Sequence, residues 1–472
     1  METQNWLLKQ AATQPDHLAI DDGKQRLTFS ELKEKVEIIA GKLDVLEPGS
    51  KVGLLAQNNI ESYCLALAII STARTIVWLN WRLSDEELTR QIEDAQLQLC
   101  LVDKKLEHPM MANTKIFMNF KQFFALDSQP MPLVESFKFS NIASIMYTSG
   151  TTGKPKGVLQ SFANHFYSAV SSALNLGLKN NDEWLCVAPI FHISGFSIVM
   201  RGLIYGMTVR LVDKFNAQKI ENILVREPIT IMSVVPYMLK KLIYQQHFSH
   251  QHYQRLFRCM LLGGGTIDLA TLKMCEQLQI PVVQCYGMTE TCSQIVALSS
   301  DDAMQKLGSV GQPLFSTQLK LSSKNEVLIK TPALTPGYLN LPEKLPEKEI
   351  DGWYKTGDVG HLDQEGYLYI DGRLDDMLIS GGENIFPREI EEVYLHCPEV
   401  EEIAVVGKKD PEWGQVPVAF VVGKKQKLTA LIAYGYTHLA HYKVPREFIY
   451  VKELPKNASG KIQRFKLQRK LN

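Results

Sequence analysis

The sequence shows no excess of charge of either sign, no closely paired cysteines and no apolar run long enough to cross a membrane. It contains 51 Lys and Arg and 51 Asp and Glu residues among 472. This balance argues against nucleic acid or an anionic membrane surface as the main partner. Its eight cysteines include no C-x-x-C pair, so they predict buried free thiols rather than a zinc site or a disulfide framework.

The longest apolar run covers residues 63–73, which is too short for a transmembrane helix. The first twenty residues lack the charged and then apolar pattern of a signal peptide. We therefore expect no membrane span and a cytoplasmic location. The sequence leaves open whether the chain forms a homo-oligomer.

Helix-start signals alternate with short apolar runs along most of the chain. Thr28 with Glu31 and Ser84 with Glu87 form capping-box patterns, while KVGLLAQN and QLCLVD are typical of buried strands. This alternation predicts an α/β fold with parallel sheets covered on both faces. Beyond residue 300 short strands and turns predict a small β-barrel or sheet. We place a domain boundary at 373–376, between a large N-terminal part, 1–372, and a small α+β part, 377–472.

A glycine-rich loop, YTSGTTGKPKG at residues 147–157, follows an apolar run that predicts a strand. A Walker A loop requires G-x-x-x-x-G-K-[ST]. Here Pro155 stands in place of the second glycine, and Lys156 is followed by Gly157. The glycines still allow backbone N–H groups to approach an anion, and the hydroxyls and lysines add donors and charge. The loop therefore predicts a phosphate site rather than an ordinary turn.

Five motifs in order resemble those of the adenylate-forming enzymes, which include acyl-CoA synthetases, peptide-synthetase adenylation domains and firefly luciferase. TSGTTGKPKG resembles their phosphate loop, and YGMTE at 286–290 resembles their second core motif. GWYKTGD at 352–358 resembles their ribose-binding motif. GRLDDMLISGGENIFPREIE resembles the hinge and the start of the mobile domain, and PKNASGK at 455–461 the terminal lysine motif. The resemblance extends essentially from end to end.

The resemblance implies an enzyme in which a carboxylate attacks the α-phosphorus of ATP and releases pyrophosphate. Both reactants are anions, so the site must supply positive charge and exclude water. Glu290 and Thr151 would hold a bridging Mg²⁺, and Lys461 would approach the reacting groups. The implied nucleotide-binding residues are Thr148, Ser149, Gly150, Thr151, Thr152, Gly153, Lys156, Gly263, Gly264, Gly265, Tyr286, Gly287, Thr289, Asp358 and Arg373.

Asp375 lies where the superfamily has its hinge, in residues 373–376. The resemblance implies that residues 377–472 form a mobile domain that rotates between two half-reactions. Ordinary interpretations exist for single residues, such as a loop acid for Glu290, a turn residue for Asp358 and a solvated lysine for Lys461. The agreement of five motifs favours the functional interpretation.

Coenzyme A is the expected acceptor, because SGGENIFPREIE and HYKVPREF are similar to segments of acyl- and aryl-CoA ligases. PIFHISG and YGMTETCSQIVAL are similar to segments of the ligases that activate 2-succinylbenzoate in menaquinone biosynthesis. That acid carries a second carboxylate, which requires apolar walls with a few donors. The candidate substrate residues are His192, Arg201, Thr291 and Ser293, although an ordinary surface arginine is an equal alternative for Arg201. The candidate catalytic residues are Lys461, Glu290 and His192.

Two other functions remain open. A CoA ligase for another aryl or fatty acid would share the motifs, but the polar residues 291–294 disfavour an apolar tunnel. A nucleotide-binding protein without catalysis is disfavoured by Lys461, Glu290 and Asp358. Asn325 stands where the superfamily has a glycine, and because Asn tolerates the left-handed conformation the turn is expected to form.

Overall fold

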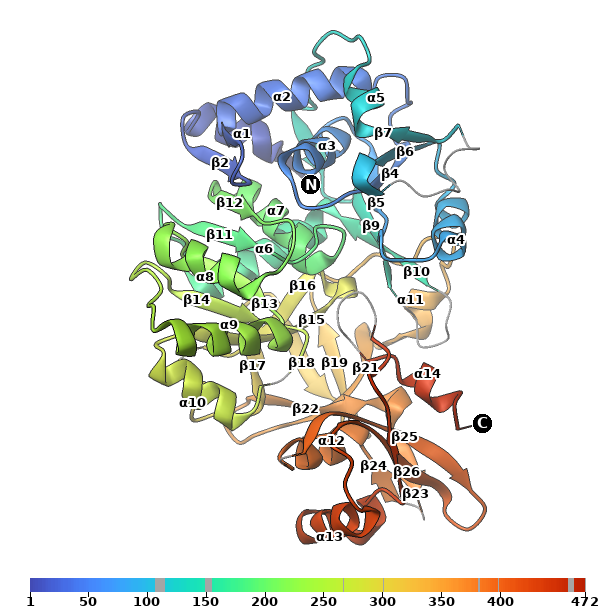
Figure 1. Ribbon diagram of the computed structural model, residues 1–472. Coiled ribbons are helices and arrows are strands. Elements are labelled where there is room, and N and C mark those ends of the chain that lie inside the picture. Colours follow the sequence, from blue (N-terminus) through green and yellow to red (C-terminus); the bar gives the residue numbers. More distant parts are fainter. Residues whose placement is uncertain are drawn as a thin grey trace. The chain divides into compact units, whose positions relative to one another are not determined.

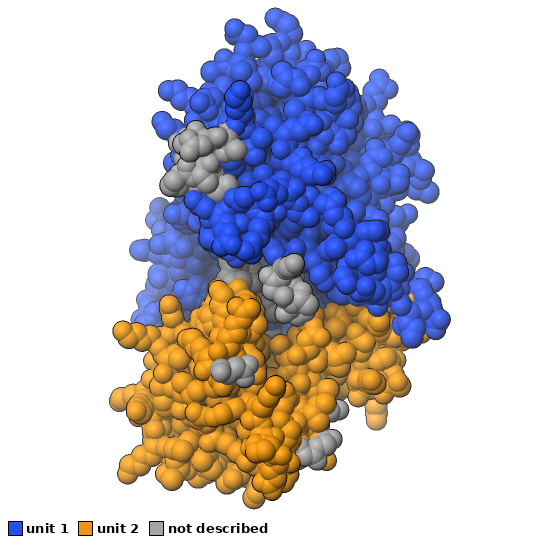
Figure 2. Space-filling view, turned by 90° about the vertical axis from the view of Figure 1, so that its right-hand side faces the viewer, with its two compact units in different colours: residues 1–318, 330–352 blue, residues 319–329, 353–472 orange. Residues whose placement is uncertain are grey.

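The computed structural model describes residues 1–106, 115–148, 155–265, 267–299, 301–380, 383–397, 399–456 and 462–471. The chain divides into two compact units, which Figure 2 distinguishes by colour. Unit 1 comprises residues 1–318 and 330–352, and unit 2 comprises 319–329 and 353–472. The boundary at 373–376 that the sequence suggests stays a prediction, because this division reflects contact density rather than motion.

One sheet of unit 1 carries the predicted phosphate loop at its edge. Its strands run β10-β9-β5-β4-β6-β7 (Figure 1), and all neighbours are parallel except the antiparallel pair β9–β10. The elements are α1 (Trp6–Thr13), α2 (Phe29–Lys42), β4 (Lys51–Leu55), α3 (Ile60–Ile70), β5 (Thr75–Trp78), α4 (Asp85–Ala95), β6 (Leu99–Val102), β7 (Phe117–Asn119), α5 (Phe120–Phe124), β9 (Ile142–Thr148) and β10 (Lys156–Ser161). Strand β1 (Glu2–Gln4) pairs separately with β8 (Ser136–Lys138).

A second sheet of unit 1 continues along β3-β2-β12-β11-β13-β14-β15-β16-β17. Strands β2 to β15 are parallel in this order, and β15, β16 and β17 are antiparallel. Helices α8, α9 and α10 lie side by side along one side of it (Figure 1). The strands are β2 (Leu18–Asp21), β3 (Arg26–Thr28), β11 (Glu183–Cys186), β12 (Thr208–Leu211), β13 (Ile231–Val234), β14 (Cys259–Leu262), β15 (Val282–Met288), β16 (Ser293–Ala297) and β17 (Ser309–Pro313). The helices are α6 (Phe162–Leu176), α7 (Ile193–Tyr205), α8 (Ala217–Arg226), α9 (Pro236–Ser249), α10 (Leu269–Gln277) and α11 (Lys344–Glu347).

Unit 2 contains two groups of strands. In the first, β19 (Glu326–Lys330) pairs with β21 (Trp353–Leu362), which pairs with β22 (Leu368–Arg373). In the second the order is β24-β23-β26-β25, with β27 beside β26. Strand β18 (Gln318–Leu321) begins at the boundary between the units, and β20 (Glu349–Ile350) belongs to unit 1. The remaining elements of unit 2 are β23 (Leu378–Ser380), β24 (Glu383–Ile385), α12 (Pro387–Leu395), β25 (Val400–Asp410), β26 (Gly414–Gly423), α13 (Leu428–His438), β27 (Glu447–Tyr450) and α14 (Arg464–Gln468).

Local sequence signals account for many of these boundaries. The capping boxes of Thr28 with Glu31 and Ser84 with Glu87 both form, and Pro387 begins α12. Asn325 has φ of 58°, so it adopts the left-handed conformation expected for a residue in a glycine position. These features confirm the predicted turns and helix starts.

The predicted fold class is confirmed as mixed α/β, with a large N-terminal part and a small C-terminal part. The predicted β-barrel stays a prediction. The cysteines are free, and all except the half-buried Cys285 are buried. Across the described ranges, no helix is both long and apolar enough to cross a membrane.

Candidate active site

The predicted phosphate loop lies in the chain between β9 and the edge strand β10. Thr148 ends β9, Lys156 begins β10, and the two residues are paired across the antiparallel ladder. The apolar residues of β9 are buried in the sheet, so the strand fixes where the loop leaves it. The predicted contacts of Ser149, Gly150, Thr151, Thr152 and Gly153 lie outside the described residues.

A tyrosine joins this loop to the predicted metal-binding acid. The Tyr338 hydroxyl donates to Glu290 Oε1 at 3.0 Å, and Lys156 Nζ lies 5.8 Å from the centroid of the Tyr338 ring. An ammonium group over an aromatic face is attracted by the ring quadrupole. The structure therefore brings Lys156 and Glu290, which are far apart in the sequence, to one tyrosine, the lysine near its ring and the acid at its hydroxyl.

Glu290 lies in a tightly held turn between β15 and β16. Its backbone carbonyl accepts from the Thr335 N–H at 2.7 Å, and the neighbouring Thr289 carbonyl accepts from Gln160 Nε2 at 3.0 Å. Gly287 must be a glycine, because a Cβ there would lie 2.0 Å from the Ser293 carbonyl oxygen. These contacts fix the backbone around Glu290. Its carboxylate is bonded to the Tyr338 hydroxyl through Oε1.

The glycine run after β14 makes a close-packed turn. Gly263 N–H donates to the Val234 carbonyl at 3.0 Å. Gly264 has φ of +78°, a backbone conformation that residues with a side chain rarely adopt. A Cβ at Gly265 would lie 2.9 Å from Pro236 Cγ. β14 and β15 are parallel neighbours, so this turn and Tyr286 come from adjacent strands. This placement agrees with the predicted adenine-binding pair, whose role stays a prediction.

Thr291 and Ser293 differ in what their side chains already do. The Thr291 hydroxyl is buried, accepts from the Met288 N–H at 3.1 Å and lies 2.8 Å from the Ser293 carbonyl oxygen. It therefore closes its own turn. Ser293 is half-buried, with φ of 116°, and follows Cys292, with φ of 50°. Both backbone conformations are strained for residues other than glycine. The role of Thr291 and Ser293 as substrate donors stays a prediction.

Arg201 is the most unusual charged residue of unit 1. It belongs to α7, is 2% exposed, and its guanidinium carbon lies 5.2 Å from the Trp184 ring centroid. Nε and Nη2 have no hydrogen-bond partner, and across the described ranges it forms no ion pair. Burial lowers its pKa, which Tyr205 and Cys285 partly offset. A surface arginine, the alternative left open by the sequence, is wrong.

The surroundings of Arg201 connect it to the YGMTE hairpin. Cys285 and Cys292 flank that motif; burial raises the pKa of both thiols, and the charge of Arg201 opposes this rise. The third neighbour, His165, has its pKa lowered to about 3 by burial and by Arg201. Burial of a cation without an anionic partner costs stability, and an anionic ligand would offset that cost. This position therefore suits an anionic group.

His192 occupies a different part of α7. It is the residue before the first turn, and its buried Nε2 has no hydrogen-bond partner in the part of the chain that the structure describes. Burial, with a smaller contribution from Arg82, lowers its pKa to about 4. The ring is therefore neutral at pH 7. His192 and Arg201 lie nine residues apart, about 13 Å along a helix. This separation is too long for a direct contact between the two side chains.

In unit 2 the predicted ribose-binding residues form one group. Asp358 and Arg373 pair across β21 and β22, and Arg373 Nη1 lies 2.9 Å from Asp358 Oδ1. Gly357 has φ of +75°, and a Cβ there would lie 3.0 Å from Arg373 Nη2. The Thr356 hydroxyl accepts from the Asp358 N–H and donates to the Val327 carbonyl. The motif KTGD therefore places a buried carboxylate beside a guanidinium.

The predicted hinge is a short 3₁₀ turn, Leu374–Asp376, in which Asp375 is exposed. Its neighbour Asp376 lies 3.3 Å from Arg464 Nη1. Nη2 of Arg464 donates two hydrogen bonds, of 2.7 and 2.6 Å, to the buried carboxylate of Glu391. Burial opposes the charge of Arg464, but Glu391 and Asp376 raise its pKa. This ion-pair group fixes the chain three residues beyond Lys461, which itself lies outside the described residues.

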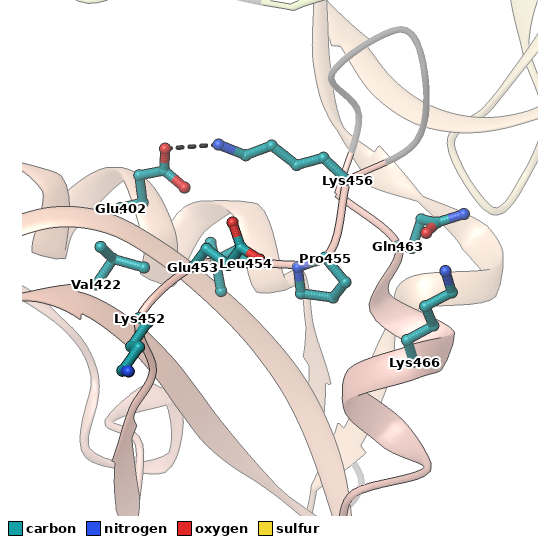
Figure 3. Close-up of a pocket in the computed structure, with 9 residues that line it drawn as sticks. All are labelled: Glu402, Val422, Lys452, Glu453, Leu454, Pro455, Lys456, Gln463 and Lys466. Atoms are coloured by element: carbon teal, nitrogen blue, oxygen red, sulfur yellow. Dashed lines mark hydrogen bonds and ion pairs between the residues drawn. The ribbon is translucent and has the colours of Figure 1, made fainter. Parts of the chain in front are cut away.

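A surface hollow of about 480 Å³ lies beside the terminal lysine motif (Figure 3). Lys456 Nζ pairs with Glu402 Oε1 at 2.5 Å along its edge. Its lining residues are Glu402, Val422, Lys452, Glu453, Leu454, Pro455, Lys456, Gln463 and Lys466. Its charges are mixed, and no predicted site residue that the structure describes lines it, so we assign it no role.

Two residues in these arrangements escape motif-based analysis. Tyr338 holds Glu290, and Gln160 holds the carbonyl of Thr289. Gln160 is fully buried and also accepts from the Ser144 hydroxyl at 2.7 Å. The available signal for Gln160 was a glutamine within an apolar strand, and the signal for Tyr338 was the turn sequence TPGYL.

The sequence is similar to known families and to known proteins over nearly its whole length. The family described as AMP-binding enzyme matches residues 7–339, and the AMP-binding enzyme C-terminal domain matches residues 389–461. The 2-succinylbenzoate–CoA ligase of Listeria monocytogenes is 43% identical over 470 residues, which cover 98% of each chain.

Solved structures of a Bacillus subtilis enzyme are similar over nearly the whole chain. The o-succinylbenzoate CoA synthetase (MenE) in complex with the acyl-adenylate intermediate OSB-AMP has a TM-score of 0.95 at 38% identity, covering 99% of this chain and 98% of that one. The same enzyme in complex with ATP and a magnesium ion has a TM-score of 0.94 at 38% identity, covering 99% of this chain and 100% of that one.

Proposed function

Because the chain belongs to the AMP-binding enzyme family, we propose that it is an ATP-dependent 2-succinylbenzoate–CoA ligase. In the first half-reaction a carboxylate oxygen of the acid bonds to the α-phosphorus of ATP, and the bond to pyrophosphate breaks. In the second, the sulfur of coenzyme A bonds to the acyl carbon, AMP leaves, and the thiol proton passes to solvent. The products are 2-succinylbenzoyl-CoA, AMP and pyrophosphate.

The observation that carries the choice of acid is the buried Arg201. The succinyl carboxylate reacts, so the ring carboxylate must be held elsewhere without reacting. A guanidinium that is 2% exposed, with Nε and Nη2 unpaired, is complementary to such a carboxylate. Trp184 beside it provides an aromatic wall, and a fatty acid would leave the cation unpaired.

The nucleotide is assigned to the residues that resemble the superfamily motifs. Lys156 supplies positive charge near the phosphates, and Asp358 with Arg373 binds the ribose. Tyr286 and the glycines 263–265 bind the adenine. Support comes from the place of Lys156 at the start of β10 and of the glycines directly after β14, from the pairing of Asp358 with Arg373 across β21 and β22, and from the close packing that requires glycine at 265 and 287.

Glu290 fits a Mg²⁺ ion that is bound mainly by phosphates. Across the described ranges no group of three or more His, Cys, Asp or Glu side chains could hold a metal by itself. Mg²⁺ characteristically takes one or two carboxylates and completes its shell with water and substrate phosphates. When bound, it neutralises phosphate charge. Glu290 offers the carboxylate, held by Tyr338, and Thr151 is the second predicted ligand.

The remaining assignments follow the same resemblance. Lys461 stabilises the negative charge that develops during adenylation, His192 lines the acyl site as a neutral ring, and Thr291 and Ser293 lie beside it. Asp375 is the hinge about which residues 377–472 turn between the half-reactions. The cytoplasmic location stays a prediction, and homo-oligomer formation stays open.

A panel of acids tests this function. The purified chain is given ATP, Mg²⁺ and coenzyme A with 2-succinylbenzoate, benzoate, a fatty acid or 4-oxo-4-phenylbutanoate, which lacks only the ring carboxylate. AMP and thioester are measured separately. We expect 2-succinylbenzoate to have the highest kcat/KM by far. A higher value for a monocarboxylate would leave the ligase class standing but remove the substrate, and no turnover of any acid would remove both.

A further inference from the structure

Three buried polar residues of unit 1 are joined by hydrogen bonds. Ser144 and Gln160 are fully buried, and His165 is 2% exposed. The Ser144 hydroxyl lies 2.7 Å from Gln160 Oε1 and 3.0 Å from His165 Nε2. The other end of the Gln160 amide, Nε2, lies 3.0 Å from the Thr289 carbonyl oxygen. We define the His165 network as His165, Ser144 and Gln160; it ends on the residue directly before Glu290.

The His165 network connects elements that are distant in the sequence. Ser144 belongs to β9 and Gln160 to β10, and the two residues are directly opposed in the antiparallel ladder. These are the strands on either side of the predicted phosphate loop. His165 belongs to α6, and Thr289 begins the 3₁₀ turn Thr289–Thr291. The network therefore ties both strands of the phosphate loop to the turn that carries Glu290.

The direction of each hydrogen bond in the network follows from the bond to Thr289. A carbonyl oxygen only accepts, so the Gln160 amide must turn Nε2 toward Thr289 and Oε1 toward Ser144. The single hydroxyl proton of Ser144 is then donated to Gln160, and the Ser144 oxygen accepts from His165. The His165 ring must therefore carry its proton on Nε2. Burial, with a smaller contribution from Arg201, lowers the pKa of His165 to about 3, which agrees with a neutral ring.

The bond to Thr289 is one of several that hold Glu290. The Glu290 carbonyl accepts from the Thr335 N–H at 2.7 Å, and its carboxylate accepts from the Tyr338 hydroxyl. A fully bonded buried network is rigid, whereas a glutamine amide without a fixed partner for Oε1 is free to rotate. We propose that Gln160 is a positioning residue for Glu290, and that Ser144 and His165 keep its amide oriented.

This inference rests on the proposed function, in which Glu290 offers the carboxylate for Mg²⁺, and it adds the residues that aim that carboxylate. Loss of a group that orients a metal ligand typically lowers metal affinity 10–100-fold. Gln160 acts through the backbone next to Glu290 rather than on the carboxylate, so we expect the lower end of this range, about tenfold. A network that only stabilised the core would lower the thermal midpoint and leave the metal affinity unchanged.

The test is calorimetric titration of the full chain with ATP at a series of free Mg²⁺ concentrations, without acid or coenzyme A. The variants are Ser144→Ala, which lacks the donor to Gln160 Oε1, and Gln160→Met, which has similar length and no donor. Each should weaken the apparent Mg²⁺ affinity about tenfold. Gln160→Met alone decides the question if Ser144→Ala does not fold.

Ser62→Ala is the matched control for Ser144→Ala. Ser62 is also fully buried, and its hydroxyl donates to the Gln57 carbonyl at 2.6 Å. Both serine variants lose a buried hydrogen bond, so both should have lower thermal midpoints. Only Ser144→Ala should also have a lower Mg²⁺ affinity, because Ser62 lies in α3 and has no bond to the His165 network.

A double variant shows whether the effect passes through Glu290. Glu290→Gln keeps the shape of the side chain and removes its charge. In that background Ser144→Ala should cause no further loss of Mg²⁺ affinity. In turnover assays with 2-succinylbenzoate, Ser144→Ala should raise the Mg²⁺ concentration that gives half-maximal rate, while saturating Mg²⁺ largely restores kcat. NMR of the protein with isotope-labelled histidine should show the His165 proton on Nε2.

Four results would overturn the proposal. Ser144→Ala and Gln160→Met could keep the wild-type Mg²⁺ affinity, Ser62→Ala could lose as much as they do, the loss could persist in the Glu290→Gln background, or His165 could carry its proton on Nδ1. A wild type that does not bind ATP with Mg²⁺ would overturn the proposed function as well. A wild type that turns over 2-succinylbenzoate beside variants of unchanged Mg²⁺ affinity would overturn this inference alone.

Discussion

The replacement of Arg201 by methionine should stabilise the free protein while it impairs recognition of the acid. Methionine has similar length and no charge. In the free protein, burial of a guanidinium without an acidic partner costs several kcal/mol, and the contact with Trp184 returns about 2 kcal/mol. The difference predicts that Arg201→Met raises the free energy of unfolding by about 1–3 kcal/mol. Most core substitutions act in the opposite direction.

A matched control is available in Arg210, another buried arginine of unit 1. It pairs with Glu227 at 2.7 Å and lies 3.5 Å from Asp21. Removal of one partner of a buried ion pair leaves uncompensated charge and costs about 3–5 kcal/mol. Arg210→Met should therefore lower the thermal midpoint by several degrees, whereas Arg201→Met should raise it by a few.

The effect on recognition is measured with two acids that differ by one carboxylate. Loss of a buried charge-assisted partner costs about 2–5 kcal/mol in binding. Arg201→Met should therefore lower kcat/KM for 2-succinylbenzoate by about 10²–10³-fold. For 4-oxo-4-phenylbutanoate, which lacks the ring carboxylate, the same substitution should be nearly neutral. The double difference isolates the coupling between Arg201 and that carboxylate.

Two outcomes would refute this reasoning. If Arg201→Met lowers the thermal midpoint as Arg210→Met does, the arginine stabilises the fold and is not an uncompensated charge. If both acids lose kcat/KM equally, Arg201 does not distinguish them, and the ring carboxylate is held by other groups such as Ser293.

Three further predictions concern the catalytic cycle and pH. Lys461→Ala should slow adenylation by about 10²–10³-fold while thioester formation from supplied acyl-AMP changes far less, and equal loss in both half-reactions would contradict domain alternation. Asp375→Pro should let the adenylate accumulate and slow its transfer to coenzyme A, because proline fixes φ at the hinge; full rates in both steps would place the hinge elsewhere. The folded pKa values of about 4 for His192 and about 3 for His165 lie below the unfolded value of about 6.5. Their contribution to stability is therefore complete above about pH 6.5 and is lost as pH falls toward 4, by about 2 kcal/mol per histidine at pH 5; denaturant midpoints that do not change over this range would contradict it.

Local signals in the sequence predicted the parts of the fold that depend on short-range chemistry. The capping boxes at Thr28 and Ser84 specify helix starts because their partners lie three residues away. The loop after residue 148 was placed correctly at a strand end, since a strand and a glycine-rich turn are adjacent in the chain. The left-handed Asn325 follows from one residue's conformational range.

Contacts between distant segments could not be predicted in this way. The bond from Tyr338 to Glu290 spans 48 residues, and that from Gln160 to Thr289 spans 129. Neither partner carries a signal of the other in its own neighbourhood. The burial of Arg201 was equally hidden, because it depends on the packing of α7 beside Trp184 and the hairpin rather than on the helix itself.

The departures from local rules gather around one hairpin, and this distribution bears on function. Arg201 is buried and has no ion pair with any residue that the structure describes, Cys292 and Ser293 adopt φ of 50° and 116°, and Gly287 has no room for a Cβ. Each feature reduces stability on its own. Natural sequences are otherwise consistent across levels, and they retain such costs mainly where a ligand repays them. The same hairpin carries Glu290, so we expect a bound acid and nucleotide to stabilise this region most. Hydrogen exchange measured with 2-succinylbenzoate present tests this, because the hairpin should then exchange faster in Arg201→Met than in the wild type.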